Sequence, residues 1–66
     1  MKNLSIVIVN WNTEKEITDC LSSIIRNADL KKVDVYVVDN NSADNSITVI
    51  EKEFNWVHLI KNKNVN

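Results

Sequence analysis

Aliphatic runs alternate with helical patterns along this chain, and this alternation limits the folds open to its 66 residues. Residues 4–9 form an almost continuous aliphatic run, typical of a strand that is covered on both faces in a parallel sheet. Residues 33–38 form a second run, rich in β-branched side chains and broken only by Asp34. Residues 57–60 form a short third run. The sequence therefore predicts three strands.

The segments between the runs have the periodicity of amphipathic helices. Thr13 and Glu16 fit a capping box at the start of the first helix, and Asn27 is suited to end it. Ser42 or Asp44 can cap the second helix. The predicted apolar stripes consist of Ile17, Cys20, Leu21, Ile24 and Ile25 in the first helix and of Ile47, Val49, Ile50 and Phe54 in the second.

The order of these elements predicts an α/β fold, β-α-β-α-β, with a parallel three-stranded sheet and helices packed on it. Right-handed crossovers connect parallel strands in this way. Two helices can cover such a sheet only in part, and both of its edges stay open. Because a core this small leaves a margin of a few kcal/mol at most, we expect a marginally stable chain or self-association through the open sheet edges.

The chain contains no glycine and no proline. This absence excludes phosphate loops built on glycine, both the G-x-G-x-x-G and the G-x-x-x-x-G-K-[ST] types, and so weakens the reading as half of a dinucleotide-binding domain. Eleven asparagines offer the next best residue for turns and left-handed backbone. The net charge of −1 gives no electrostatic footprint for nucleic acid, so we expect no nucleic-acid partner.

Covalent and metal chemistry have little support in the sequence. The single cysteine, Cys20, cannot form an internal disulfide, and its place in the helical stripe predicts a buried, inert thiol. His58 stands apart from other ligand residues, and Ala43 interrupts the calcium-loop pattern that begins at Asp39, so no metal site is expected. The apolar run at the N-terminus is too short for a signal peptide or a transmembrane segment, which predicts a cytoplasmic protein.

Two polar segments, residues 10–12 and 39–42, follow the first two predicted strands. Open parallel sheets bind ligands beyond the carboxyl ends of their strands, so function is expected there. Asp39 can accept an N–H from a ligand, and Trp11 can stack on a flat heterocycle. Asp39 can instead be a turn or capping residue, and Trp11 can close the end of the core. Together the two side chains suggest a cleft of nucleobase size.

Three sequence motifs follow one another along the chain. Residues 5–12 read Ser-Ile-Val-Ile-Val-Asn-Trp-Asn, residues 21–24 read Leu-Ser-Ser-Ile, and residues 37–46 read Val-Val-Asp-Asn-Asn-Ser-Ala-Asp-Asn-Ser. In this order they resemble the opening of a family 2 glycosyltransferase, with residues 21–24 as the family's middle element. The variants present look most like the branch that builds bacterial surface polysaccharides, rhamnosyltransferase-like members included. Val9 departs from the pattern, since proline is usual there.

This resemblance implies a GT-A, Rossmann-like nucleotide-sugar domain, of which residues 1–66 are the nucleotide-binding N-terminal portion. It implies transfer of a sugar from a UDP- or dTDP-sugar to an acceptor hydroxyl with inversion, in cell-surface polysaccharide synthesis, in the cytoplasm or at the inner face of the membrane. By position, Asp39 accepts the N3–H of uracil or thymine and Trp11 packs near the base. The other residues carried over are Val9 and Asn10, which border the base through their backbone, and Asn41 and Ser42, which line the nucleoside side.

The family also implies Mg²⁺ or Mn²⁺ in the complete enzyme. Its metal ligands and its catalytic base match no residue of this sequence, so no catalytic or metal residue is assigned and the 66 residues alone are expected to be inactive. The alternative is a non-catalytic parallel α/β module that binds a nucleotide or a partner, with Asp39 capping a helix.

Overall fold

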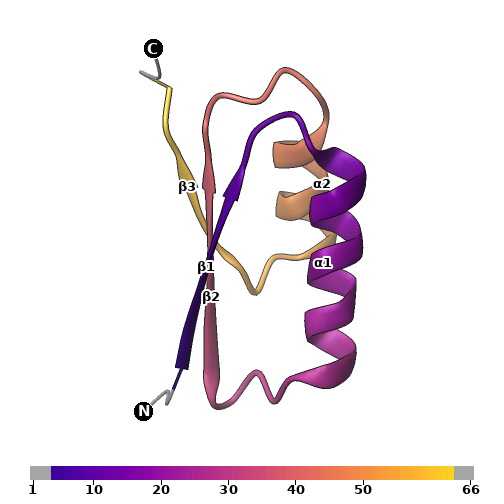
Figure 1. The fold of residues 1–66 in the computed structure, drawn as a ribbon, viewed down its shortest axis with the longest axis vertical. Helices are drawn as coiled ribbons and strands as arrows, with labels where there is room; N and C mark the ends of the chain where they lie inside the picture. The colour runs from indigo at the N-terminus through magenta and orange to yellow at the C-terminus, as the bar shows by residue number, and fades with distance from the viewer. Residues whose placement is uncertain (1–3, 64–66) are drawn as a thin grey trace.

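The computed structural model describes residues 4–63, which form three strands and two helices in the order β-α-β-α-β (Figure 1). This order confirms the predicted fold class. No helix within these residues is long and apolar enough to cross a bilayer. The elements are β1 (Leu4–Asn10), α1 (Glu14–Asn27), β2 (Val33–Asp39), α2 (Ser46–Glu53) and β3 (His58–Lys61).

The three strands form one parallel sheet in the order β1-β2-β3. β1 and β2 are in register along their whole length, so Asn10 lies beside Asp39 where both strands end. The third strand begins one residue later than predicted. Val57 donates its N–H to the carbonyl of Phe54 at 3.0 Å and so belongs to the turn after α2 rather than to β3.

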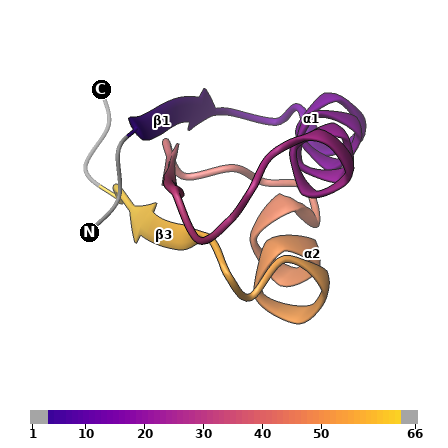
Figure 2. The same cartoon turned by 90° about the horizontal axis from the view of Figure 1, so that it is seen from below.

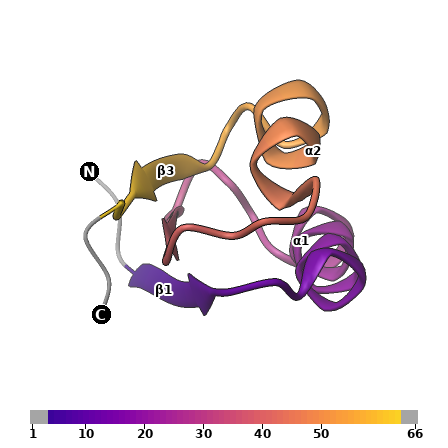
Figure 3. The same cartoon turned by 90° about the horizontal axis from the view of Figure 1, so that it is seen from above.

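Both helices lie on the same face of the sheet, as Figures 2 and 3 show. The chain moves in one direction across the sheet, and right-handed crossovers in one direction place successive helices on one side. The buried core lies between the helices and this face. It consists of Ile17, Leu21, Val35, Val37, Ile50, Phe54 and Val57.

No described element covers the opposite face, which we call the bare face. It carries Val7, Val9 and Ile60, whose exposed fractions are 64%, 65% and 50%. The expectation that residues 4–9 are covered on both faces is therefore wrong for residues 4–63. The aliphatic side chains on both sides of β1 would allow the strand to be covered on both faces. Both helices, however, pack on the same face of the sheet.

Cys20 is exposed, which corrects the prediction of a buried thiol. The same stripe holds Ile17 and Leu21 fully in the core, while Ile25 is 49% exposed. α1 packs near the β1 edge of the sheet (Figure 2). The flank of its apolar stripe that carries Cys20 therefore extends past the last strand, beside Ile8 and Val9. Ile25 lies on the opposite flank of the stripe, since five positions correspond to about 140° around a helix.

Two asparagines adopt the left-handed backbone that glycine usually supplies. Asn12 has φ 53° and Asn41 has φ 59°, each in the loop that follows a strand. This confirms the inference that asparagine replaces glycine in the turns. α1 ends at Asn27 as predicted, where the side-chain amide donates to the carbonyl of Ser23 at 2.8 Å.

Candidate functional site at the carboxyl end of the sheet

Asn10 and Asp39 are the innermost residues of the candidate site, and neither has exposed surface. The amide Nδ2 of Asn10 donates to Oδ1 of Asp39 at 2.7 Å. The backbone reinforces this contact, because the N–H of Asn40 donates to the carbonyl of Asn10 at 2.9 Å. β1 and β2 are therefore joined at their carboxyl ends through both main chain and side chains.

Ser42 completes a three-residue cluster with Asn10 and Asp39. Its N–H donates to Oδ2 of Asp39 at 2.9 Å, and its hydroxyl donates to Oδ1 at 2.7 Å. The same hydroxyl oxygen accepts from Nδ2 of Asn10 at 3.2 Å and from the N–H of Asn12 at 2.9 Å. The Asp39 carboxylate thus accepts three hydrogen bonds, two at Oδ1 and one at Oδ2, which leaves Oδ2 with one unused acceptor position.

The other predicted site residues lie around this cluster without hydrogen-bonding to it. Trp11 is 62% exposed, so it does not close the end of the core. Asn41 is exposed, at the left-handed turn of the second loop. Val9 points to the bare face, because successive side chains alternate along β1 and Asn10 points to the helix side. The structure therefore brings Asn10, Asp39 and Ser42 together and leaves Val9, Trp11 and Asn41 at the periphery.

Asp44 joins the starts of both helices. The sequence predicted it as a possible cap of the second helix but did not reveal its contact with the first. Its Oδ2 accepts the N–H of Glu14 in the first turn of α1, and its Oδ1 accepts the N–H of Ser46 in α2, each at 3.0 Å. Glu14 returns the contact, because its Oε1 accepts the N–H of Asn45 at 3.1 Å. We call this reciprocal pair of Asp44 and Glu14 the loop latch. The only sequence signal for the loop latch was the presence of an acidic residue, Glu14 or Asp44, near the start of each predicted helix.

The predicted capping box of Thr13 and Glu16 does not form. The hydroxyl of Thr13 instead donates to Oδ1 of Asn10, and the structure gives no side-chain cap for α1 from Thr13. Asp44 supplies the missing acceptor from the other loop. For α2, Asp44 is the capping side chain of the two that were expected, because Ser42 is held by Asp39.

The pKa of Asp44 lies below its ordinary value of 3.8. The main cause is the hydrogen bond from the hydroxyl of Ser46, which favours the charged carboxylate. Partial burial opposes this effect, and the N–H groups of Ser46 and Glu14 add to it. The loop latch therefore depends on an ionised Asp44.

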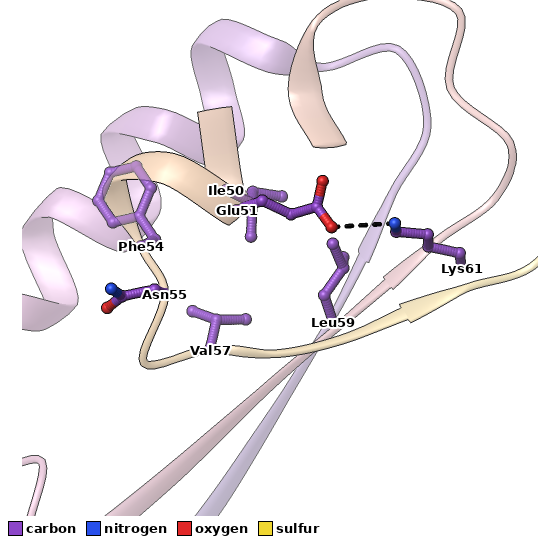
Figure 4. A pocket seen from close by; sticks show the side chains of 7 residues that line it. All are labelled: Ile50, Glu51, Phe54, Asn55, Val57, Leu59 and Lys61. Carbon is purple, nitrogen blue, oxygen red and sulfur yellow. Dashed lines mark hydrogen bonds and ion pairs between the residues drawn. The ribbon is translucent and has the colours of Figure 1, made fainter. Parts of the chain in front are cut away.

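Within residues 4–63, neither a metal-ligand cluster nor the cavity beside α2 adds chemistry at these loops. Residues 4–63 contain no group of three or more His, Cys, Asp or Glu side chains that could hold a metal ion. His58 lies on the bare face, stacked on Tyr36 with ring centroids 4.6 Å apart and 3.4 Å from Oδ1 of Asp34. A cavity of about 430 Å³ lies elsewhere, between α2 and β3, and none of the predicted site residues lines it (Figure 4).

Comparison with known families gives one match. The family described as "Glycosyl transferase family 2" matches residues 5–66, nearly the whole chain, and all six predicted site residues lie inside the match. Neither the curated proteins nor the solved structures gave a match.

Proposed function

This chain belongs to glycosyl transferase family 2, and on that premise we propose that the loops after β1 and β2 bind the nucleoside of a nucleotide-sugar donor. The observation that carries the proposal is the cluster of Asn10, Asp39 and Ser42. It lies beyond the carboxyl ends of two adjacent parallel strands, where open α/β sheets bind their ligands.

Asp39 recognises the base in this proposal. Its Oδ2 has one acceptor position left, and an imide N3–H of uracil or thymine is a donor of the right kind. Cytosine presents an acceptor at N3, so it would leave the buried carboxylate facing a lone pair, at a cost of about 1–3 kcal/mol. Because Asp39 has no exposed surface, binding requires a movement of the loops that cover it. The donor is therefore a UDP- or dTDP-sugar.

The peripheral residues complete the pocket. Trp11 presents an exposed ring that is free to pack against the base. Asn41 and Ser42 line the nucleoside side from the second loop, and the backbone of Val9 and Asn10 borders the base from the first. The left-handed turn at Asn41 supports this assignment, because it turns the chain back over the end of β2.

The remaining chemistry of the enzyme is assigned to no residue of this chain. We take residues 1–66 as the nucleotide-binding portion of a catalytic domain that transfers a sugar to an acceptor hydroxyl with inversion, in surface polysaccharide synthesis at the cytoplasmic side of the membrane. Mg²⁺ or Mn²⁺ serves such enzymes by neutralising the leaving diphosphate. The described residues offer no ligand group that fits the cation, so no step is derived through it.

A titration followed by ¹⁵N–¹H correlation spectra tests the proposal. We expect UDP to cause saturable shifts at Trp11, Asp39 and Ser42, and CMP to cause none at the same concentrations. Asp39→Asn should abolish the UDP shifts, because an amide offers Oδ1 alone as acceptor, and Asp19→Asn on the exposed face of α1 is the matched control. UDP and CMP shifts of equal size would overturn the assignment of Asp39 to base recognition.

One observation favours a second candidate, a non-catalytic α/β module in which Asp39 is structural. Asp39 is fully buried and already accepts three hydrogen bonds within the protein. The same titration separates the two candidates. A dispersed spectrum that no nucleotide changes identifies the module, whereas saturable UDP shifts identify the nucleotide site.

A further inference from the structure

Two loops cover Asp39 at the carboxyl end of the sheet. The first, residues 11–13, runs from the end of β1 to α1, and the second, residues 40–45, runs from the end of β2 to α2. Both loops cross from the sheet to the helices at the same end of the molecule (Figures 1 and 3). Because Asp39 has no exposed surface, a ligand reaches its carboxylate only after part of these loops has moved.

The loops are anchored where they leave the sheet. The N–H of Asn40 donates to the carbonyl of Asn10 at 2.9 Å, which extends the pairing of β1 and β2 by one residue. The N–H of Asn62, just after β3, donates to the carbonyl of Asp39 at 2.8 Å. The side chains of Asn10 and Asp39 add a buried hydrogen bond of 2.7 Å. Movement at this end of the loops would therefore disturb the sheet itself.

The loops are also anchored where they enter the helices. The loop latch of Glu14 and Asp44 joins the two helix starts with hydrogen bonds of 3.0 and 3.1 Å. Two short stretches remain between the anchors. We call residues 11–13 the first tip and residues 41–43 the second tip.

Asn12 supplies the hydrogen bonds that join the two tips. Its Oδ1 accepts the N–H of Ala43 at 2.6 Å, and its own N–H donates to Oγ of Ser42 at 2.9 Å. Within residues 4–63 no other residue of the first tip bonds to the second tip. Ser42 in turn donates to both oxygens of Asp39. Asn12 therefore holds in place the residue that occupies the carboxylate.

The two hydrogen bonds of Asn12 cost less to break than the bonds at the anchors. Asn12 and Ala43 are exposed, so their polar groups regain hydrogen bonds to water when the tips part. The bond between Asn10 and Asp39 is buried, and its loss would leave a carboxylate without its partner. Ligand-binding loops are drawn from the less protected contacts of a fold. Opening is therefore expected at the tips.

We propose that Asn12 is a positioning residue that keeps the nucleoside site closed, and that the nucleoside reaches Asp39 once both hydrogen bonds of Asn12 are broken. This inference rests on the proposed function. The tips part while the sheet and the loop latch stay in place. Trp11 is the neighbour of Asn12 in the first tip, so its exposed ring moves as the site opens.

Closure of the tips lowers the affinity for the nucleotide. When only the open form binds, the apparent dissociation constant equals the intrinsic constant divided by the fraction of open chains. Loss of a hydrogen bond of Asn12 raises that fraction, so it should tighten binding. Loss of a residue that contacts the ligand has the opposite effect, and so has general damage to the fold. The direction of the change therefore identifies the role of Asn12.

Titration of Asn12→Gly with UDP, followed by ¹⁵N–¹H correlation spectra, tests this role. Glycine keeps the left-handed backbone at this position, where φ is 53°, and removes the amide that accepts from Ala43. We expect the dissociation constant of UDP to fall at least about threefold. Asn27→Gly is the matched control, because its amide donates to the carbonyl of Ser23 at the far end of α1. This control should keep the wild-type constant.

The possible results separate this inference from the proposed function. If UDP binds the wild type and binds Asn12→Gly no more tightly, the closing role of Asn12 is overturned and the nucleotide site stands. UDP shifts in neither chain overturn both. UDP shifts in Asn12→Gly alone support both, because the open fraction of the wild type is then too small for binding.

Amide hydrogen exchange without nucleotide tests the link between the tips directly. The exchange rate of the Ala43 N–H is divided by that of Asn40, at the anchored end of the same loop, to correct for global stability. Asn12→Gly should raise this ratio at least about threefold. Asn12→Asp keeps an oxygen for the N–H of Ala43 and should restore the wild-type ratio. An unchanged ratio in Asn12→Gly overturns the proposal whatever UDP does.

Discussion

At the scale of single residues, Asn12 and Asn41 allow a chain without glycine to turn sharply at its site. Both have positive φ, but their side chains differ. Oδ1 of Asn12 accepts the N–H of Ala43 at 2.6 Å, whereas within the described residues Asn41 forms no side-chain hydrogen bond. Substitutions at the two positions can therefore measure separately the free-energy cost of the left-handed backbone and the stabilisation that the side-chain amide contributes.

We predict that Asn41→Ala lowers the free energy of unfolding by about 1 kcal/mol, because a Cβ-bearing residue without a local polar group resists left-handed backbone. Asn41→Gly should leave stability unchanged or raise it slightly. Asn12→Gly should be destabilising in spite of its easier backbone, because the bond to Ala43 is lost. Urea denaturation of the three variants measures these differences, and equal stability of the two Asn41 variants would contradict the argument.

Asp39→Asn should lower the free energy of unfolding by about 1–3 kcal/mol. An amide has one acceptor oxygen, so its NH₂ must face either the donor Nδ2 of Asn10 or the N–H of Ser42. Denaturation of the variant beside Asp19→Asn measures the effect, since Asp19 is 69% exposed and has only Lys15 as its partner. A loss no larger than that of the control would show that the cluster can rearrange around an amide.

At the scale of elements, the loop latch holds the two helix N-termini together. Asp44 accepts N–H groups from α1 and from α2, and Glu14 accepts one from the start of α2. Asp44→Ala should therefore destabilise both helices at once, by about 2 kcal/mol if each cap is worth about 1 kcal/mol. Amide hydrogen exchange should quicken in the first turns of both helices. Faster exchange in α2 alone would show that the contact with α1 contributes nothing.

The loop latch also makes the free energy of unfolding depend on pH. The pKa of Asp44 is lowered in the folded chain from its ordinary value of 3.8, so its contribution to stability is complete above that pH. The contribution is lost as the pH falls through the lower, folded pKa. The difference in unfolding free energy between the wild type and Asp44→Ala should therefore be constant near neutrality and shrink in acid. A difference that persists unchanged well below pH 3.8 would contradict a charged latch.

The order of the elements followed from the sequence because periodicity reports local structure. The strand and helix patterns needed only neighbouring residues, and so did the polar segments that follow two strands. The partners of the polar side chains could not be predicted in the same way. Asp44 meets Glu14 across 30 positions, because the two loops approach each other in space. Thr13 bonds to Asn10 within its own loop, and the amide of that asparagine is held by Asp39 on the neighbouring strand. The exposure of Cys20 depends on α1 lying at a sheet edge, which no helical pattern records.

At the scale of the whole molecule, the sheet has one covered face and one bare face. Its core rests on two helices, and Val7, Val9 and Ile60 remain half exposed or more. We predict a free energy of unfolding below about 5 kcal/mol and a broad thermal transition. The transition should shift upward with protein concentration, because the self-association expected through the open sheet edges would stabilise the folded chain by mass action. A sharp, concentration-independent transition of a monomer at high temperature would contradict both expectations.

The hydrogen bond between Asn10 and Asp39 spans 29 positions, so it forms only when two distant segments of the chain are brought together. Parallel strands cannot be joined by a short hairpin, so β1 and β2 pair across the whole intervening segment, α1 included. The cluster at their ends therefore exists only while both strands are in the sheet. Under the proposed function, recognition of a nucleotide through Asp39 would accordingly report that β1 and β2 are paired.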